Sequence, residues 1–430
     1  MKYSRRWARL DNAANIFPSA TSSRDTKVFR FACELRDEVD PQILSRALDR
    51  TIQQFPLFLS VLKRGLFWYY FEETARRPAV EQEHEPPCAP IYSGDRKNLL
   101  FKVTYYKRRI NFEVFHALTD GTGALQFLRT LVCYYIGERY AGELDGRLPA
   151  IDYDASESQK STDSFSRYYS GKPQGSFTSG CKAYKLRGDV FFERRLSVIE
   201  GLLSAPAVLA EAKKRGATLT EFLAAVLICA IRDTMSVQDQ QRPVVVTVPV
   251  NLRRFFPSET ARNFFSVVNV SYRFGQGDDS LEAVLASVRQ TFQSELTTER
   301  LRCRLDKLGA LERHFAAKMA PLVFKDVVLR IASAKDSRGV TAALSNLGVV
   351  QMPPEAAPYV RMFDVLVSTE KMQTCLCTFG SCLAVSFTSP FLGTDVQRRF
   401  FRTLTELGLE VEISANQADT TEQENAYAVL

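Results

Sequence analysis

The sequence predicts an α+β fold built as two lobes, each a mixed β-sheet with packed helices. At 430 residues the chain is too long for one ordinary hydrophobic core. Alternating strand-like runs and helix-like apolar stripes follow one another in α+β order. A polar stretch at 152–180, rich in Ser and Gly, separates the two halves. We therefore expect an N-terminal lobe over 1–151, a linker or surface loop over 152–180, a C-terminal lobe over 181–413 and a disordered tail over 414–430.

The N-terminal half is predicted to contain a sheet covered by helices. Residues 29–35 alternate as a strand does. Asp40 and Pro41 then start a helix, because Asp is a favoured N-cap and Pro fits the first turn. This helix ends at Phe55–Pro56. Further strands are expected over 59–62, 66–71, 99–106 and 111–116.

The C-terminal half is predicted to alternate helices and strands. A helix is expected over 198–215, ended by Gly216. Thr218 and Glu221 have the spacing of a capping box and open the next helix. The β-branched run Val244–Val250 is typical of a buried strand.

The most informative segment is F-H-A-L-T-D-G, at 115–121. His116 lies at the end of the alternating strand, where functional residues concentrate. Asp120 precedes an apolar-striped helix over 124–135, whose N-terminus favours negative charge. The segment therefore predicts strand, tight loop and helix. A neutral imidazole there has a reference pKa of ~6.5 and suits general base catalysis.

H-x-x-x-D-G between a strand and a helix resembles the signature of the chloramphenicol-acetyltransferase-like superfamily. That group includes alcohol O-acyltransferases and the condensation domains of nonribosomal peptide synthesis. Segments within Val248–Asn269 and at Ser345–Gly348 resemble later parts of the same pattern. Trp7–Pro18 and Phe67–Glu72 resemble bacterial alcohol acetyltransferases. The resemblance covers nearly the whole chain and implies two chloramphenicol-acetyltransferase-like lobes with an active-site channel between them.

Two departures from the superfamily favour the bacterial alcohol acetyltransferase-like branch. Condensation domains typically carry a doubled histidine, whereas Phe115 stands before His116 here. The Asp-Phe-Gly-Trp-Gly string of plant acyltransferases is absent from the sequence.

The resemblance implies a role for each residue of the motif. His116 would be the general base. Asp120 would pair with Arg253 and hold the loop, and Gly121 would keep space for the donor or for the turn. Of the other two histidines, His84 lies in a charged loop and His314 in a basic helical stretch, and both are expected at the surface.

The residue that stabilises the oxyanion stays open at the level of sequence. Ser345 is the first side-chain candidate, and Asn346 would orient its loop. Asn263 and Asn269 are alternatives that would line the channel between the lobes. All four could instead satisfy backbone groups at strand ends.

These features predict an acyltransferase that moves an acyl group, expected to be acetyl, from coenzyme A to an alcohol or amine. The acyl-CoA is a co-substrate, and no permanently bound cofactor is expected. No G-x-S-x-G nucleophile elbow is present, which favours direct attack by the acceptor. Two rivals are a condensation-like enzyme that uses an acyl carrier protein, and a non-catalytic binding module.

Composition excludes several other classes. The 56 basic and 49 acidic residues are dispersed, so we expect no nucleic-acid binding, and the net charge of +7 fits solubility. Nine cysteines spread through predicted elements indicate a reducing compartment. Cys375, Cys377 and Cys382 lack a second ligand pair, so no metal is expected, and Gly380–Ser381 predicts a hairpin turn instead.

Targeting signals are not evident in the sequence. The first residues have no apolar core of a secretory signal. No run of ~20 apolar residues occurs, so no membrane span is expected. We therefore expect a cytoplasmic monomer.

Overall fold

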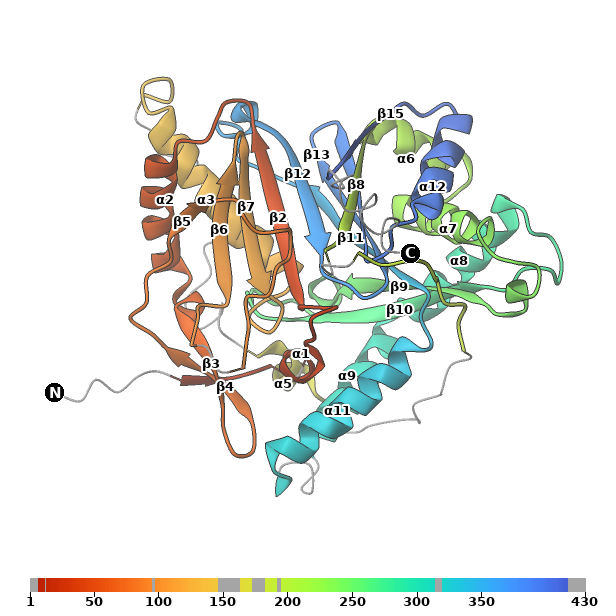
Figure 1. Ribbon diagram of the computed structural model, residues 1–430, viewed down its shortest axis with the longest axis horizontal. Helices are drawn as coiled ribbons and strands as arrows, with labels where there is room; N and C mark the ends of the chain where they lie inside the picture. The colour runs from red at the N-terminus through yellow and green to blue at the C-terminus, as the bar shows by residue number, and fades with distance from the viewer. Residues whose placement is uncertain are drawn as a thin grey trace, which may run out of the picture.

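The computed structural model describes residues 7–11, 13–94, 97–145, 163–171, 182–191, 195–313 and 319–416. It confirms an α+β fold with two large sheets, each covered by helices on its outer side (Figure 1). Among the described residues, no helix is both long and apolar enough to cross a membrane.

The N-terminal lobe is built on a five-stranded sheet and a smaller three-stranded one. The five strands, in spatial order, are β12 (Val360–Val367), β2 (Val28–Leu35), β7 (Arg109–Phe115), β6 (Phe101–Tyr106) and β5 (Val80–Gln82). The smaller sheet contains β1 (Trp7–Arg9), β4 (Tyr69–Glu73) and β3 (Ser60–Arg64). The helices of this half are α1 (Ile16–Ala20), α2 (Pro41–Gln54), α3 (Gly121–Arg139) and α5 (Ser164–Tyr168).

The second large sheet has seven strands. In spatial order they are β10 (Phe265–Tyr272), β9 (Val244–Asn251), β11 (Ala342–Val350), β13 (Met372–Phe379), β14 (Cys382–Ser389), β8 (Ser197–Ser204) and β15 (Val411–Ala415). The helices of this half are α6 (Ala205–Lys214), α7 (Leu219–Arg232), α8 (Leu281–Glu295), α9 (Thr298–Arg313), α11 (Leu322–Ser337) and α12 (Asp395–Glu406).

Several predicted local signals act as expected. The Asp40 carboxylate caps α2, and Pro41 occupies its first position. Thr218 and Glu221 form the capping box of α7. The turn at 380–381 joins β13 to β14, with Gly380 in the left-handed region at φ 56°.

The helix predicted over 198–215 is wrong in its first half. Residues up to Ser204 form β8, and only Ala205–Lys214 are helical as α6. An apolar run of this length fits either element, and here it pairs with β14 on one side and β15 on the other. Ser204 caps α6 and Pro206 occupies its first turn, a local start signal that marks the true boundary.

The expected C-terminal lobe over 181–413 is not self-contained. β12, which lies inside that range, joins the N-terminal sheet and pairs antiparallel with β2. No local sequence signal shows which sheet β12 joins, because its place depends on pairing with a strand far away in the sequence. β12 therefore belongs to the N-terminal sheet, although it lies in the C-terminal half of the sequence.

The structure also differs from the expected bounds of the tail and of the linker. β15 extends to Ala415, two residues into the predicted tail, because its backbone pairs with β8. Within the expected linker, Ser164–Tyr168 forms α5 and buries Phe165 against Phe264. The rest of the linker, apart from 163–171, and the tail beyond 416 lie outside the described residues, as does His314.

A buried group of charges joins the two large sheets. Arg109 of β7 donates through Nη2 to Oε1 of Glu200 on β8, at 3.0 Å, and through Nε to Oε2 of Glu34 on β2, also at 3.0 Å. Burial, together with the neighbouring Asp364 carboxyl, raises the pKa of Glu200 to about 8. Arg109 thus connects strands of the two large sheets through polar side chains.

Candidate active site

The H-x-x-x-D-G segment has the predicted strand, loop and helix. His116 directly follows the end of β7, and Asp120 directly precedes α3. Oδ1 of Asp120 accepts hydrogen bonds from the backbone N–H groups of Thr122 and Gly123, both at 3.1 Å. The carboxylate therefore acts as the N-cap of α3, where the free N–H groups favour a negative charge.

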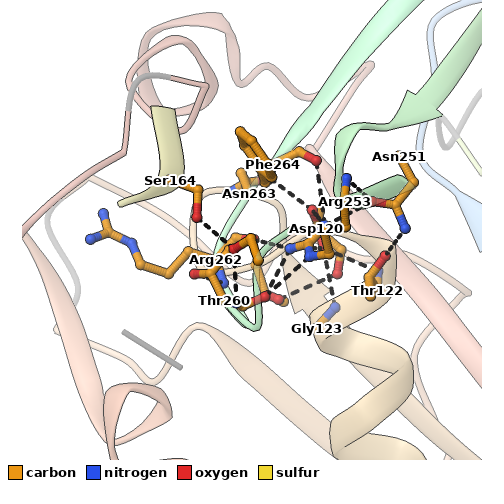
Figure 2. A network of polar contacts seen from close by, with 12 residues as sticks. Asp120, Thr122, Gly123, Ser164, Asn251, Arg253, Thr260, Arg262, Asn263 and Phe264 are labelled. Atoms are coloured by element: carbon orange, nitrogen blue, oxygen red, sulfur yellow. Dashed lines mark hydrogen bonds and ion pairs between the residues drawn. The ribbon is translucent and has the colours of Figure 1, made fainter. Parts of the chain in front are cut away.

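The same carboxylate forms an ion pair across the lobes. Nη1 of Arg253 lies 2.8 Å from Oδ2 of Asp120, and the backbone N–H of Phe264 donates to that oxygen at 2.8 Å (Figure 2). Both side chains are nearly buried, at 6% and 11% exposure. Arg253 also donates to the carbonyls of Thr260 and Arg262, at 2.9 and 2.7 Å. The expected contact is present, and both carboxylate oxygens of Asp120 accept hydrogen bonds.

The His116 ring is held in one tautomer by Asn263. Nδ1 of His116 lies 3.2 Å from Oδ1 of Asn263. The amide nitrogen of Asn263 donates to the His116 carbonyl at 3.1 Å and to Oδ2 of Asp11 at 3.4 Å, which fixes the orientation of the amide. Its oxygen must then face the ring and accept the Nδ1 proton. Nε2 of the neutral ring consequently carries the lone pair.

Aromatic side chains enclose the ring. Phe17 stacks on it with ring centroids 4.3 Å apart, and Phe29 and Phe265 lie at 4.8 and 5.7 Å. Burial lowers the pKa of His116 below its ordinary value of 6.5 despite the opposing effects of nearby hydrogen bonds and of Asp120. The imidazole is therefore neutral at pH 7, the form that accepts a proton.

Two glycines at the start of α3 are constrained by different neighbours. A Cβ on Gly121 would lie 2.9 Å from Cδ2 of Leu347, the end of a side chain that can move. A Cβ on Gly123 would lie 2.1 Å from the carbonyl oxygen of Ala261 and 2.2 Å from Oγ1 of Thr119. The stricter requirement is thus at Gly123, which sequence reasoning did not single out.

Asn263 is not available as an oxyanion donor, contrary to that expectation, because both hydrogens of its amide are already donated. Asn269 lies far along β10, four residues after Phe265, or about 13 Å of extended strand. It is exposed, accepts from Oγ1 of Thr247 at 2.8 Å, and lines a separate pocket of about 530 Å³. The structure does not bring Asn269 to His116.

The two candidates on β11 differ in their contacts. Asn346 donates to Oγ1 of Thr220 and accepts from the backbone N–H of Gly348, both at 2.8 Å. It therefore holds β11 against the start of α7. Ser345 pairs in register with Cys375 of β13 and makes no side-chain hydrogen bond within the described part of the chain. No contact among the described residues joins its hydroxyl to His116.

A residue beside the candidate site that the sequence analysis did not single out is Asp11. Its carboxylate is buried, and it accepts from the Asn263 amide and from the backbone N–H of Ala14 at 2.7 Å. Burial raises the pKa of Asp11 to about 6, despite the nearby Arg262 guanidinium. A hydrogen-bond chain of Asp11, Asn263 and His116 thus connects three segments that are far apart in sequence.

Replacement of Asn263 should change the pH profile of the reaction in a specific way. In Asn263→Ala the ring loses the partner that fixes its tautomer, so kcat should fall by about 10–100-fold. That partner also raises the pKa of His116, so the acid limb of kcat/KM should move to lower pH. Asn98→Ala, at a half-buried site bonded to Arg76, is the matched control. An unchanged pH profile in Asn263→Ala would mean that the Asn263 amide does not affect the basicity of His116.

Comparisons with solved structures identify proteins that share this fold. No family model matches the sequence, and no curated protein matches it either. Solved structures do match over more than nine-tenths of both chains. F. graminearum TRI101, complexed with coenzyme A and T-2 mycotoxin, has a TM-score of 0.63 at 12% identity, over 91% of this chain and 96% of that chain.

Two further structures agree. TRI3 trichothecene 15-O-acetyltransferase from Fusarium sporotrichioides has a TM-score of 0.61 at 11% identity, over 94% of each chain. A mutant starter condensation domain of rhizomide synthetase, in complex with C8-CoA, has a TM-score of 0.62 at 14% identity, over 92% of this chain and 93% of that chain. The chain has the chloramphenicol-acetyltransferase-like fold. At these identities the likeness establishes architecture, not activity.

Within this chloramphenicol-acetyltransferase-like fold, the contacts place His116 where the lobes meet. Its own strand belongs to the N-terminal sheet, whereas Asn263 and Phe265 belong to the segment that leads into and begins β10. Among the described residues, no cluster of three or more His, Cys, Asp or Glu side chains could hold a metal ion. A neutral histidine with a free Nε2 is suited to proton transfer.

Proposed function

We propose that the protein is an acyltransferase that moves an acyl group from coenzyme A to an alcohol or amine, with His116 as the general base. One observation carries this proposal: Oδ1 of Asn263 lies 3.2 Å from Nδ1 of His116 while the Asn263 amide nitrogen donates elsewhere, an arrangement that makes Nε2 the basic atom of a neutral ring. The acyl group we expect is acetyl. The acyl-CoA is a co-substrate and not a resident cofactor.

The chemistry follows from this tautomer. The acceptor hydroxyl gives its proton to Nε2 as its oxygen attacks the thioester carbonyl carbon. The tetrahedral intermediate then collapses, the carbon–sulfur bond breaks, and the leaving thiolate takes the proton from Nε2. Asn263 and Asp11 orient the ring while it is charged. We assign the oxyanion contact to Ser345, whose hydroxyl has no other partner among the described residues.

Direct attack is favoured because several deeply buried cysteines are poorly suited to a covalent step. Cys33, Cys88 and Cys377 are buried, and burial raises the pKa of each thiol well above its ordinary value. Burial likewise raises the pKa of Cys375 to about 12. A thiol that stays protonated is a weak nucleophile.

The choice of donor rests on the solved structures of the same fold. One such structure holds coenzyme A together with T-2 mycotoxin, and another holds C8-CoA. Because the second of these is a condensation domain, a carrier-protein thioester is the second candidate donor. Phe115 in place of the first histidine favours coenzyme A.

A comparison of donors distinguishes the two candidates. The purified chain should transfer acetyl from acetyl-CoA to at least one member of a panel of alcohols and amines. Both substrates must be bound together, so double-reciprocal plots should intersect, whereas a covalent route gives parallel lines. Transfer only from an acylated carrier protein would replace coenzyme A in the proposal, and transfer from neither donor would support a non-catalytic module.

A further inference from the structure

Helix α11 presents an apolar face to solvent. Five large side chains of this helix are 49–66% exposed: Val323, Phe324, Val327, Val328 and Ile331. Their spacing of i, i+1, i+4, i+5 and i+8 puts them on one side of the helix, here named the α11 apolar face. The other side is packed, since Leu322 and Asp326 are buried. The helix is thus amphipathic with its apolar side outward.

The tip of the β3–β4 hairpin adjoins the first turn of α11. The backbone N–H of Leu322 donates to the Leu66 carbonyl at 2.8 Å, and Nζ of Lys325 donates to the Phe67 carbonyl at 2.8 Å. Leu66 and Trp68 are themselves 71% and 42% exposed. Both elements protrude at the lower end of the molecule (Figure 1). Exposed apolar side chains gathered at one end of a molecule are typical of an interaction surface.

Basic side chains lie at this end of the molecule. The guanidinium of Arg9 lies 4.6 Å from the Trp68 ring, and the half-exposed Arg64 covers the buried Asp326 at 3.0 Å. Arg330 is exposed on α11. Apolar and aromatic side chains beside Lys and Arg are typical of helices that lie in a membrane interface.

We propose that this end of the protein binds the surface of an anionic lipid bilayer, with the α11 apolar face in the headgroup region. The basic surroundings favour this occupant over a second copy of the chain, which would bring the same positive charge against itself. The basic side chains attract anionic lipids, and salt weakens this attraction because it screens the charges. A protruding helix also suits a flat surface. This inference is independent of the proposed acyl transfer.

Vesicle flotation with the full chain tests the proposal. The protein should float with vesicles of phosphatidylcholine and phosphatidylglycerol, and less with phosphatidylcholine alone or at high salt. The double variant Phe324→Asp, Val328→Asp should partition at least about tenfold more weakly, because two apolar side chains of the face become charged. Val237→Asp, at an 83% exposed site outside α11, should float like the wild type. Melting curves would verify that all three proteins fold.

Several results would overturn the membrane proposal. Wild-type protein that stays unbound with anionic vesicles would do so, as would a double variant that floats normally. A wild-type dimer that the double variant converts to a monomer would identify the face as a self-association surface instead. Binding of an acidic carrier protein through Phe324, without vesicle binding, would identify a protein partner. Flotation needs no catalysis, so its failure would leave the acyltransferase proposal intact.

Discussion

His116→Gln should lower turnover by about 10²–10⁴-fold, the usual contribution of a positioned general base. Glutamine keeps a polar side chain that can donate to the Asn263 oxygen, so the free energy of unfolding should change by only about 1 kcal/mol. The measurement is kcat with acetyl-CoA, together with a denaturant melt. His84→Gln is the matched control, since His84 is exposed and its ring contacts only the Gln82 carbonyl among the contacts described.

The pH profile of the wild type gives a second readout of the same residue. Because the folded-state pKa of His116 lies below 6.5, activity should persist as pH falls past 6.5 and be lost only near that lower value. For a group with a depressed folded pKa, protonation favours the unfolded chain, so stability is also lost as pH falls through this range. Near-normal turnover in His116→Gln would remove His116 from the mechanism.

The second large effect concerns Asp120 and Arg253. Each single change, Asp120→Asn or Arg253→Met, should lower the free energy of unfolding by about 3–5 kcal/mol, because it leaves a charge buried without its partner. Asparagine is also a good N-cap, so Asp120→Asn isolates the charge from the cap. Activity should fall with stability, since the loop carries His116.

A double-mutant cycle tests whether this loss comes from the pair. The double variant should cost less than the sum of the single ones, by about 1–3 kcal/mol. The exposed pair Arg398–Asp395, with side chains 56% and 63% exposed, is the control, and Arg398→Met should cost less than about 1 kcal/mol. Strict additivity at Asp120 and Arg253 would mean that their contact contributes nothing to stability.

What the sequence could predict here was local. The strand, loop and helix around His116 follow from alternation, an Asp cap and an apolar stripe within about 25 residues. The boundary error at β8 was local as well, since the start signal at Ser204 and Pro206 was present but outweighed by the apolar run. The expected Asp120–Arg253 contact came from the resemblance, not from spacing.

The remaining features depend on contacts between distant segments. Asn263 meets His116 across 147 positions and Asp11 across 252, and no pattern in either segment specifies the other. The same holds for β12, whose place beside β2 depends on register across more than 300 residues. Such contacts form only when the two sheets pack, which is why the orientation of the base could not be predicted.

Transfer of labelled acetyl tests the central claim most directly. Acetyl-CoA labelled in its acetyl group is incubated with the protein, first alone and then with an accepted alcohol, and the label is located by mass spectrometry. Direct attack assisted by His116 predicts no label on the protein in either sample, label on the alcohol in the second, and almost none in His116→Gln. Acetyl held covalently on a serine or cysteine, and passed to the alcohol when it is added, would contradict the account.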